Sequence, residues 1–171
     1  MNIYIIGYTC SGKTTTGKRL AKKLGWNFLD LDKYIEIKHN KSINDIFDEF
    51  GEKTFREFEK QAVNDSLSLH ETVIATGGGT PCFNNQMQIL KENGICIYLK
   101  MNAKTLTSRI TKSKQRPLFK NITQSQLGDF VINNLKEREF FYVQAHYIVD
   151  VLDIELINIL VKLINKKSNY I

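Results

Sequence analysis

The sequence of this 171-residue chain predicts an α/β fold in which a parallel sheet is wound by right-handed crossovers. Short apolar runs rich in β-branched and aromatic residues alternate along the chain with stretches of helical periodicity. A glycine-rich motif typical of phosphate binding follows the first run directly. The predicted strands are residues 3–6, 27–31, 73–76, 95–99 and 147–149.

Glycine and capping signals mark the ends of the predicted helices. The first helix is expected over residues 14–24, and Gly25, Gly51 and Gly94 each follow a helical stretch, where a left-handed residue is common. Ser42 and Asp45 have the spacing of a capping box that opens a helix over residues 43–50.

Two segments interrupt the plain alternation of strands and helices. Residues 34–70 hold two predicted helices, more than a crossover requires, and residues 111–124 are polar, basic and broken by Pro117. We therefore expect one domain over residues 1–171, with an acceptor-binding insert at about 32–70 and a mobile lid at about 111–124.

The composition limits the cellular compartment and the classes of binding partner that we expect for this chain. The three cysteines form no CxxC pair, and no basic leader or apolar run of about twenty residues is present, which favours a soluble cytoplasmic protein without a membrane partner. The net charge of +6 comes from scattered lysines without interleaved aromatic residues, so we expect no nucleic-acid partner. We expect a monomer that binds small anionic molecules.

Residues 7–14, Gly-Tyr-Thr-Cys-Ser-Gly-Lys-Thr, complete the pattern GxxxxGK[ST] between a predicted strand and a predicted helix. Backbone N–H groups of such a loop surround a phosphate at the positive end of the helix. Lys13 is expected to reach the β- and γ-phosphates, and the Thr14 hydroxyl to ligate Mg²⁺. A glycine-rich turn with a surface lysine is the alternative, which the strand–loop–helix context disfavours. The other candidate ATP-binding residues of this segment are Gly7, Cys10, Ser11, Gly12 and Thr15.

Two acidic residues, Asp30 and Asp32, end the second predicted strand. Ligands of open parallel sheets bind beyond the carboxyl ends of the strands, so both acids should face the phosphate loop. One carboxylate could hold the metal through water, and the other could orient a hydroxyl acceptor or take its proton. Alternatively, the pair simply caps the next helix.

The insert and the third strand contribute two further candidates. Arg56 and Glu59 could form only a helix-surface pair, or Glu59 could orient Arg56 to grip a substrate carboxylate. Gly77, Gly78 and Gly79 follow the third strand, and close approach of a ligand to the backbone explains three costly glycines better than a simple strand exit.

Three more arginines are candidates of lower specificity. Arg116 could act as a lid residue on the transferred phosphate, and Arg109 could flank or stack on the nucleotide base. Both also have an ordinary solvent-exposed interpretation. The pattern around Arg138 alone favours a helix-surface residue.

In order and spacing, these residues resemble the shikimate kinase family across essentially the whole chain. The resemblance rests on the phosphate loop, Phe28–Asp32, Gly51–Glu59, Ala75–Gly79, Arg109 seven residues before Arg116-Pro117-Leu118, and Arg138 with Tyr142. It implies a three-layer α/β/α fold with a five-stranded parallel sheet, the P-loop architecture of nucleoside-monophosphate kinases. It also implies Mg²⁺-dependent transfer of the ATP γ-phosphate to the 3-hydroxyl of shikimate, a step in chorismate and aromatic amino acid biosynthesis.

The same resemblance assigns roles to individual residues. Asp32 would bind the ring hydroxyls, Arg56 and Arg138 would hold the substrate carboxylate, and Asp30 would support Mg²⁺ through water. The catalytic residues would be Lys13, Asp32 and Arg116, with Arg116 closing over the phosphates. Backbone contacts to the substrate would come from the glycines at 77–79.

Other functions share parts of this pattern. A gluconate kinase of the same fold would share the phosphate loop but would not need the Arg56 motif together with three glycines. A nucleoside-monophosphate kinase would need a pocket for a base, whereas the insert offers an arginine and acidic residues. A regulatory GTPase would need an NKxD motif, which the sequence lacks, and the DxxG match at residues 48–51 lies in a helical stretch. A catalytically silent nucleotide-binding module would not need so many reactive groups.

Overall fold

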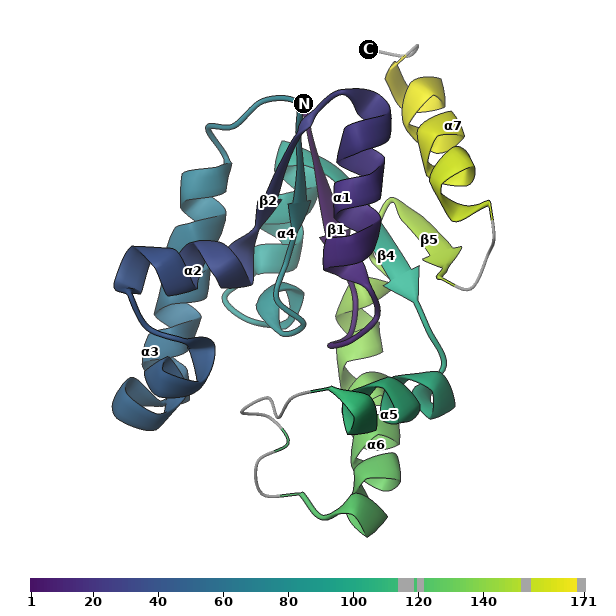
Figure 1. Ribbon diagram of the computed structural model, residues 1–171. Coiled ribbons are helices and arrows are strands. Elements are labelled where there is room, and N and C mark those ends of the chain that lie inside the picture. Colours follow the sequence, from purple (N-terminus) through teal and green to yellow (C-terminus); the bar gives the residue numbers. More distant parts are fainter. Residues whose placement is uncertain (114–118, 120–121, 152–154, 169–171) are drawn as a thin grey trace.

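The computed structural model describes residues 1–113, 119, 122–151 and 155–168 (Figure 1). Strands and helices alternate through most of this length, as the sequence predicts. The elements are β1 (Asn2–Ile6), α1 (Lys13–Leu24), β2 (Asn27–Asp30), α2 (Leu31–His39), α3 (Ile43–Ser66), β3 (Thr72–Ala75), the 3₁₀ helix η1 (Thr80–Cys82), α4 (Gln86–Asn93), β4 (Gly94–Lys100), α5 (Ala103–Lys112), α6 (Gln124–Tyr142), β5 (Tyr147–Asp150) and α7 (Leu156–Ser168).

The five described strands form one sheet in the order β2-β3-β1-β4-β5, and every neighbouring pair is parallel. Each predicted strand agrees with an observed one to within one residue at either end. The predicted α/β class and parallel sheet are therefore confirmed.

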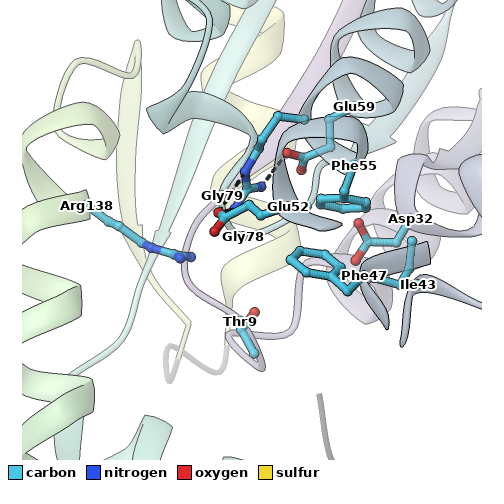
Figure 2. A pocket seen from close by; sticks show the side chains of 12 residues that line it. Thr9, Asp32, Ile43, Phe47, Glu52, Phe55, Glu59, Gly78, Gly79 and Arg138 are labelled. Atoms are coloured by element: carbon cyan, nitrogen blue, oxygen red, sulfur yellow. Dashed lines mark hydrogen bonds and ion pairs between the residues drawn. The ribbon is translucent and has the colours of Figure 1, made fainter. Parts of the chain in front are cut away.

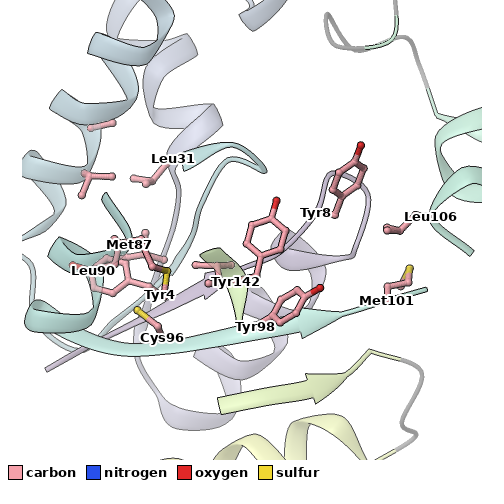
Figure 3. Packing of buried hydrophobic residues seen from close by; sticks show 14 of the residues in the cluster. Tyr4, Tyr8, Leu31, Met87, Leu90, Cys96, Tyr98, Met101, Leu106 and Tyr142 are labelled. Atoms are coloured by element: carbon pink, nitrogen blue, oxygen red, sulfur yellow. The ribbon is translucent and has the colours of Figure 1, made fainter. Parts of the chain in front are cut away.

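Alternation along β1 explains the three layers. Ile3 and Ile5 are buried in one cluster with residues of α1 and α7, whereas Tyr4 and Ile6 are buried in a second cluster on the opposite face. In the second cluster, Tyr4 packs with Met87 and Leu90 of α4 (Figure 3). Because successive side chains of a strand point to opposite faces, helices cover both sides of the sheet (Figure 1).

Three glycines each follow a helical stretch in the sequence, but the structure requires glycine at these positions for different reasons. Gly25 ends α1 in the left-handed conformation at φ 71° and Gly51 interrupts α3 at φ 77°, as expected. The same prediction is wrong for Gly94, whose φ of 176° is extended backbone at the start of β4. A Cβ there would lie 2.6 Å from the carbonyl oxygen of Asn2, so the close approach of β1 requires glycine.

The segment between β2 and β3 contains the two expected helices, with the second longer than the sequence indicates. The capping box of Ser42 and Asp45 is present, and α3 continues beyond Gly51 to Ser66. Tyr34 of α2 donates a hydrogen bond to Asp65 of α3 at 2.8 Å, which holds the two helices together. This packing fixes the residues of α3 that face the carboxyl ends of the strands.

No helix in the described part of the chain is long and apolar enough to cross a membrane. This finding agrees with the absence of a long apolar run in the sequence.

The close contact at Gly94 predicts an asymmetric effect of adding one methyl group. Gly94→Ala should lower the free energy of unfolding by about 1–3 kcal/mol, because the new Cβ overlaps backbone atoms of β1. In the control Gly128→Ala, the Cβ meets no atom within 4 Å on helix α6, and the helix should gain about 0.5–1 kcal/mol. Urea unfolding of both variants tests this; equal effects would contradict the packing explanation.

Candidate active site

The loops that follow β1, β2 and β3 meet at the carboxyl edge of the sheet, where the sequence predicts the ligand site. A cavity of about 320 Å³ opens there. Its lining combines the phosphate loop, the two helices of the insert, the triple glycine and α6. Figure 2 shows Arg138 reaching toward the cavity from one side, Asp32 from the other, and Thr9 of the phosphate loop between them.

Positive φ angles shape the phosphate loop. Gly7 has φ 143°, Cys10 φ 62° and Gly12 φ 99°. A Cβ on Gly7 would lie 2.8 Å from the carbonyl oxygen of Leu99 in β4 and 3.2 Å from Ser11 Oγ within the loop, so close neighbours as well as the φ angle require glycine here. Gly12 caps the first turn of α1 in the left-handed region, where glycine is favoured. The loop therefore wraps the N-terminus of α1, the end that favours anions.

The predicted lysine and threonine of the loop have defined partners. Lys13 is 8% exposed, and its ammonium donates to the carbonyl oxygens of Gly7 at 2.9 Å and Tyr8 at 2.8 Å. The Thr14 hydroxyl donates to the Asp30 carboxylate at 2.6 Å. Asp30 also accepts the backbone N–H of Lys33, so it caps α2 and faces the loop at the same time. The capping interpretation of Asp30 is therefore confirmed, as is its position beside the loop, whereas its role in holding the metal stays a prediction.

The remaining loop candidates lie around the same turn. Ser11 is fully buried and Cys10 is partly exposed, whereas Thr15 is exposed on the first turn of α1. Arg109 of α5 donates to the Cys10 carbonyl oxygen at 3.3 Å, which places its guanidinium beside the loop. Contact of Arg109 with a nucleotide stays a prediction. Arg116 lies outside the described residues, as does much of the predicted lid.

The triple glycine is explained by close neighbours within the protein. A Cβ on Gly77 would lie 2.6 Å from Glu59 Oε1 and 2.9 Å from Asp32 Oδ1. On Gly78 it would lie 2.9 Å from the Thr9 hydroxyl, and on Gly79 2.7 Å from Arg56 Nη1. Bare backbone at these positions lets the polar side chains of three other elements converge on one cavity.

Arg56 is held by two glutamates of its own helix. Its Nη1 donates to Glu59 at 2.5 Å, while Nε and Nη2 both donate to Glu52 Oε1, at 3.2 and 2.8 Å. The guanidinium also lies over the ring of Phe83, 4.0 Å from its centroid. The sequence prediction pairs Arg56 with Glu59 alone, and the contact with Glu52 is an addition that the i, i+4 spacing of Glu52 and Arg56 signals.

Glu59 is buried at the base of this pair, with 4% of its surface exposed. It also accepts a hydrogen bond from the Thr80 hydroxyl at 2.7 Å. Burial raises the pKa of Glu59, against the opposing effect of Arg56 and Thr80. Burial lowers the pKa of Arg56, but Glu59 and Glu52 outweigh it and leave that pKa raised. The ion pair of Arg56 and Glu59 is therefore buried rather than exposed on the helix surface, and the hydrogen bond from Thr80 to Glu59 connects it to η1.

Arg138 corrects the helix-surface interpretation of its local pattern. It is 8% exposed and lines the cavity, with its guanidinium carbon 5.5 Å from the centroid of the Tyr8 ring. One turn further along α6, the Tyr142 hydroxyl donates to the carbonyl oxygen of Gly78 at 2.5 Å. Burial raises the pKa of Tyr142 well above its usual range, which keeps the phenol a donor. The contacts of α6 with the phosphate loop and the triple glycine therefore bury Arg138 at the cavity.

Comparison with known proteins gives one consistent family. A family model described as shikimate kinase matches residues 9–166. A shikimate kinase of Azobacteroides pseudotrichonymphae is 44% identical over 145 residues, covering 84% of this chain and 85% of that protein. The crystal structure of a shikimate kinase from Bacteroides thetaiotaomicron has a TM-score of 0.87 at 35% identity, covering 99% of this chain and 98% of that one. A shikimate kinase from Acinetobacter baumannii in complex with shikimate has a TM-score of 0.90 at 34% identity, covering 97% and 93%.

The burial of Glu59 predicts a large loss of stability on its removal. Glu59→Ala leaves the Arg56 charge and the Thr80 hydroxyl without a buried partner and should lower the free energy of unfolding by about 3 kcal/mol. The matched change Glu52→Ala removes a carboxylate that is 59% exposed and should cost less than about 1 kcal/mol. Chemical unfolding of both variants measures the loss. A similar loss of unfolding free energy in the two would contradict a stabilising role for the buried ion pair of Arg56 and Glu59.

Proposed function

The chain belongs to the shikimate kinase family, and we propose that the cavity described above is its shikimate site and the phosphate loop its ATP site. Family membership makes the chain an ATP-dependent kinase of the shikimate pathway. The observation that carries the residue assignments is the convergence of Arg56, Arg138 and Asp32 on one cavity that Thr9 of the phosphate loop also lines.

The chemistry of the cavity fits a small polyol acid. Arg56 and Arg138 offer guanidinium groups for the carboxylate of shikimate, and Asp32 offers an acceptor for its ring hydroxyls. Gly77, Gly78 and Gly79 expose backbone next to these groups. These contacts would fix the ring with one hydroxyl directed at the phosphate loop, the orientation on which in-line transfer depends.

The donor site uses the groups of the phosphate loop. Lys13 would exchange its carbonyl partners for the β- and γ-phosphates, and Arg109 would flank the nucleotide. The Thr14 hydroxyl and the Asp30 carboxylate, 2.6 Å apart, form the hard oxygen donor set that Mg²⁺ prefers, with Asp30 acting through water. When bound, Mg²⁺ would neutralise phosphate charge.

Transfer then requires positioning and charge stabilisation. The 3-hydroxyl oxygen of shikimate forms a bond to the γ-phosphorus while the bond from that phosphorus to the bridging oxygen of ADP breaks. Asp32 orients the hydroxyl and accepts its proton as the new bond forms. Lys13 stabilises charge on the transferring group, and Arg116 from the lid is proposed to add a second cation. The products are 3-phosphoshikimate and ADP.

We also propose that one chain suffices for this reaction. The proposal is a monomer with residues 32–70 as the acceptor-binding insert and residues 111–124 as the lid. Cys10, Cys82 and Cys96 all lie in the described residues and form no disulfide with one another, in keeping with a reducing cytoplasm. ATP and shikimate would be its small-molecule substrates.

A coupled ADP-release assay over a panel of acceptors tests the assignment. ADP should form with shikimate, stop when EDTA removes Mg²⁺, and fall about a hundredfold or more in Lys13→Met and in Asp32→Ala, because each loses a group needed for transfer. Turnover with gluconate or a nucleoside monophosphate but not with shikimate would overturn it, and nucleotide binding without turnover would favour a switch or silent module.

The bidentate role of Arg56 has a separate kinetic signature. Arg56→Lys should raise the KM for shikimate about tenfold, because an ammonium cannot reproduce the planar fork toward a carboxylate. The control is Arg19→Lys, a change at an exposed residue of α1, which should leave KM unchanged. An unchanged KM in Arg56→Lys would remove this residue from the site.

A further inference from the structure

We propose that Glu52 occupies the anion-binding edge of Arg56 while the pocket is empty, and that the carboxylate of the substrate displaces it. Glu52 would then be a specificity residue that sets which anions can enter. The proposal rests on the proposed role of Arg56 as a carboxylate-binding residue.

The geometry of Arg56 separates its two glutamate partners. Glu52 Oε1 accepts from Nε and Nη2, the pair of parallel donors on one edge of a guanidinium that suits a planar carboxylate. Glu59 accepts from Nη1 and is also bound by Thr80. An arriving carboxylate therefore competes with Glu52 for a donor pair, whereas Glu59 stays anchored by its second partner.

Exposure makes only one of these contacts easy to exchange. The Glu52 side chain is 59% exposed, whereas the Glu59 side chain is 5% exposed. Glu52 also follows Gly51, where α3 is interrupted at φ 77° and where a Cβ would meet no atom within 4 Å. Rotation of the Glu52 side chain therefore returns a largely exposed carboxylate to water, while the Arg56 side chain, which is 12% exposed, keeps its ion pair with Glu59.

Charge balance in the cavity favours the exchange. The charged groups that line it are the carboxylates of Asp32, Glu52 and Glu59 and the guanidinium groups of Arg56 and Arg138. With all of them ionised, carboxylates outnumber guanidinium groups by one, so an anionic ligand would enter a negative site. Departure of Glu52 leaves the two kinds equal in number, and the substrate carboxylate then replaces one negative charge by another.

This exchange has a consequence for selectivity. A ligand gains Arg56 only if its anion binds better than Glu52, which sits on the same helix and is always present. Neutral polyols cannot displace Glu52, and inorganic anions must compete against an intramolecular carboxylate. The pocket would thus reject weak anions at the cost of some affinity for shikimate.

The test measures binding of shikimate and of its uncharged methyl ester by isothermal titration calorimetry. In Glu52→Gln, which keeps the size of the side chain but weakens its bond to Arg56, the Kd for shikimate should fall about three- to tenfold. The Kd for the methyl ester should change less than about twofold, because the ester carries no anion to compete. Glu52→Ala, which removes the competitor entirely, should give the same pattern.

Glu57→Gln is the matched control. It removes an equal charge from an exposed position next to Arg56 that does not line the cavity, and should leave both Kd values unchanged. An unchanged or higher Kd for shikimate in Glu52→Gln, or equal gains for shikimate and its ester, would overturn the proposal. In Arg56→Lys combined with Glu52→Gln, the gain should be lost.

The result is distinguishable from failure of the proposed function. Absence of shikimate turnover in the wild-type chain would remove the function itself. Normal turnover with an unaltered Kd in Glu52→Gln would remove only the exchange.

Discussion

The buried ion pair of Arg56 and Glu59 is the interaction on which the geometry of the cavity depends. Glu59 also accepts a hydrogen bond from Thr80 of η1. The pair therefore connects α3, which lies between β2 and β3, to the loop that follows β3. Two charges placed out of water are costly unless their remaining hydrogen-bonding capacity is met, so the surrounding side chains have little freedom. The position of Arg56 relative to the sheet follows from that restriction.

Backbone without side chains is the second condition for this arrangement. The pair of Arg56 and Glu59 fits only because Gly77 and Gly79 leave room for it, and Asp32 reaches the same space over Gly77. The backbone entropy that three glycines lose on folding is thus offset by the polar contacts for which they leave room. Their conformational freedom is secondary here, since positive φ angles occur at Gly7 and Gly12 but not at these three.

Local sequence patterns predicted the fold well and the site in part. Strand periodicity, the capping box and the phosphate motif depend on neighbours within a few residues, and the structure confirms them. The burial of Arg138 and the reason for Gly94 depend on contacts between segments far apart in the chain, which periodicity cannot show. Glu52 was within reach of local reasoning, because its spacing from Arg56 is one helical turn. Arg116 stays a prediction, since it lies outside the described residues.

The contact between Thr9 and Gly78 has a consequence for how this protein can evolve. The Thr9 hydroxyl lies 2.9 Å from where a methyl group on Gly78 would fall, and the Tyr142 hydroxyl donates to the Gly78 carbonyl oxygen. The phosphate loop and the loop after β3 therefore meet in direct contact at the wall of one cavity. A side chain at position 78 would require a smaller residue at position 9 and a shift of the loop backbone, so a substitution after β3 cannot be accepted without a change in the phosphate loop.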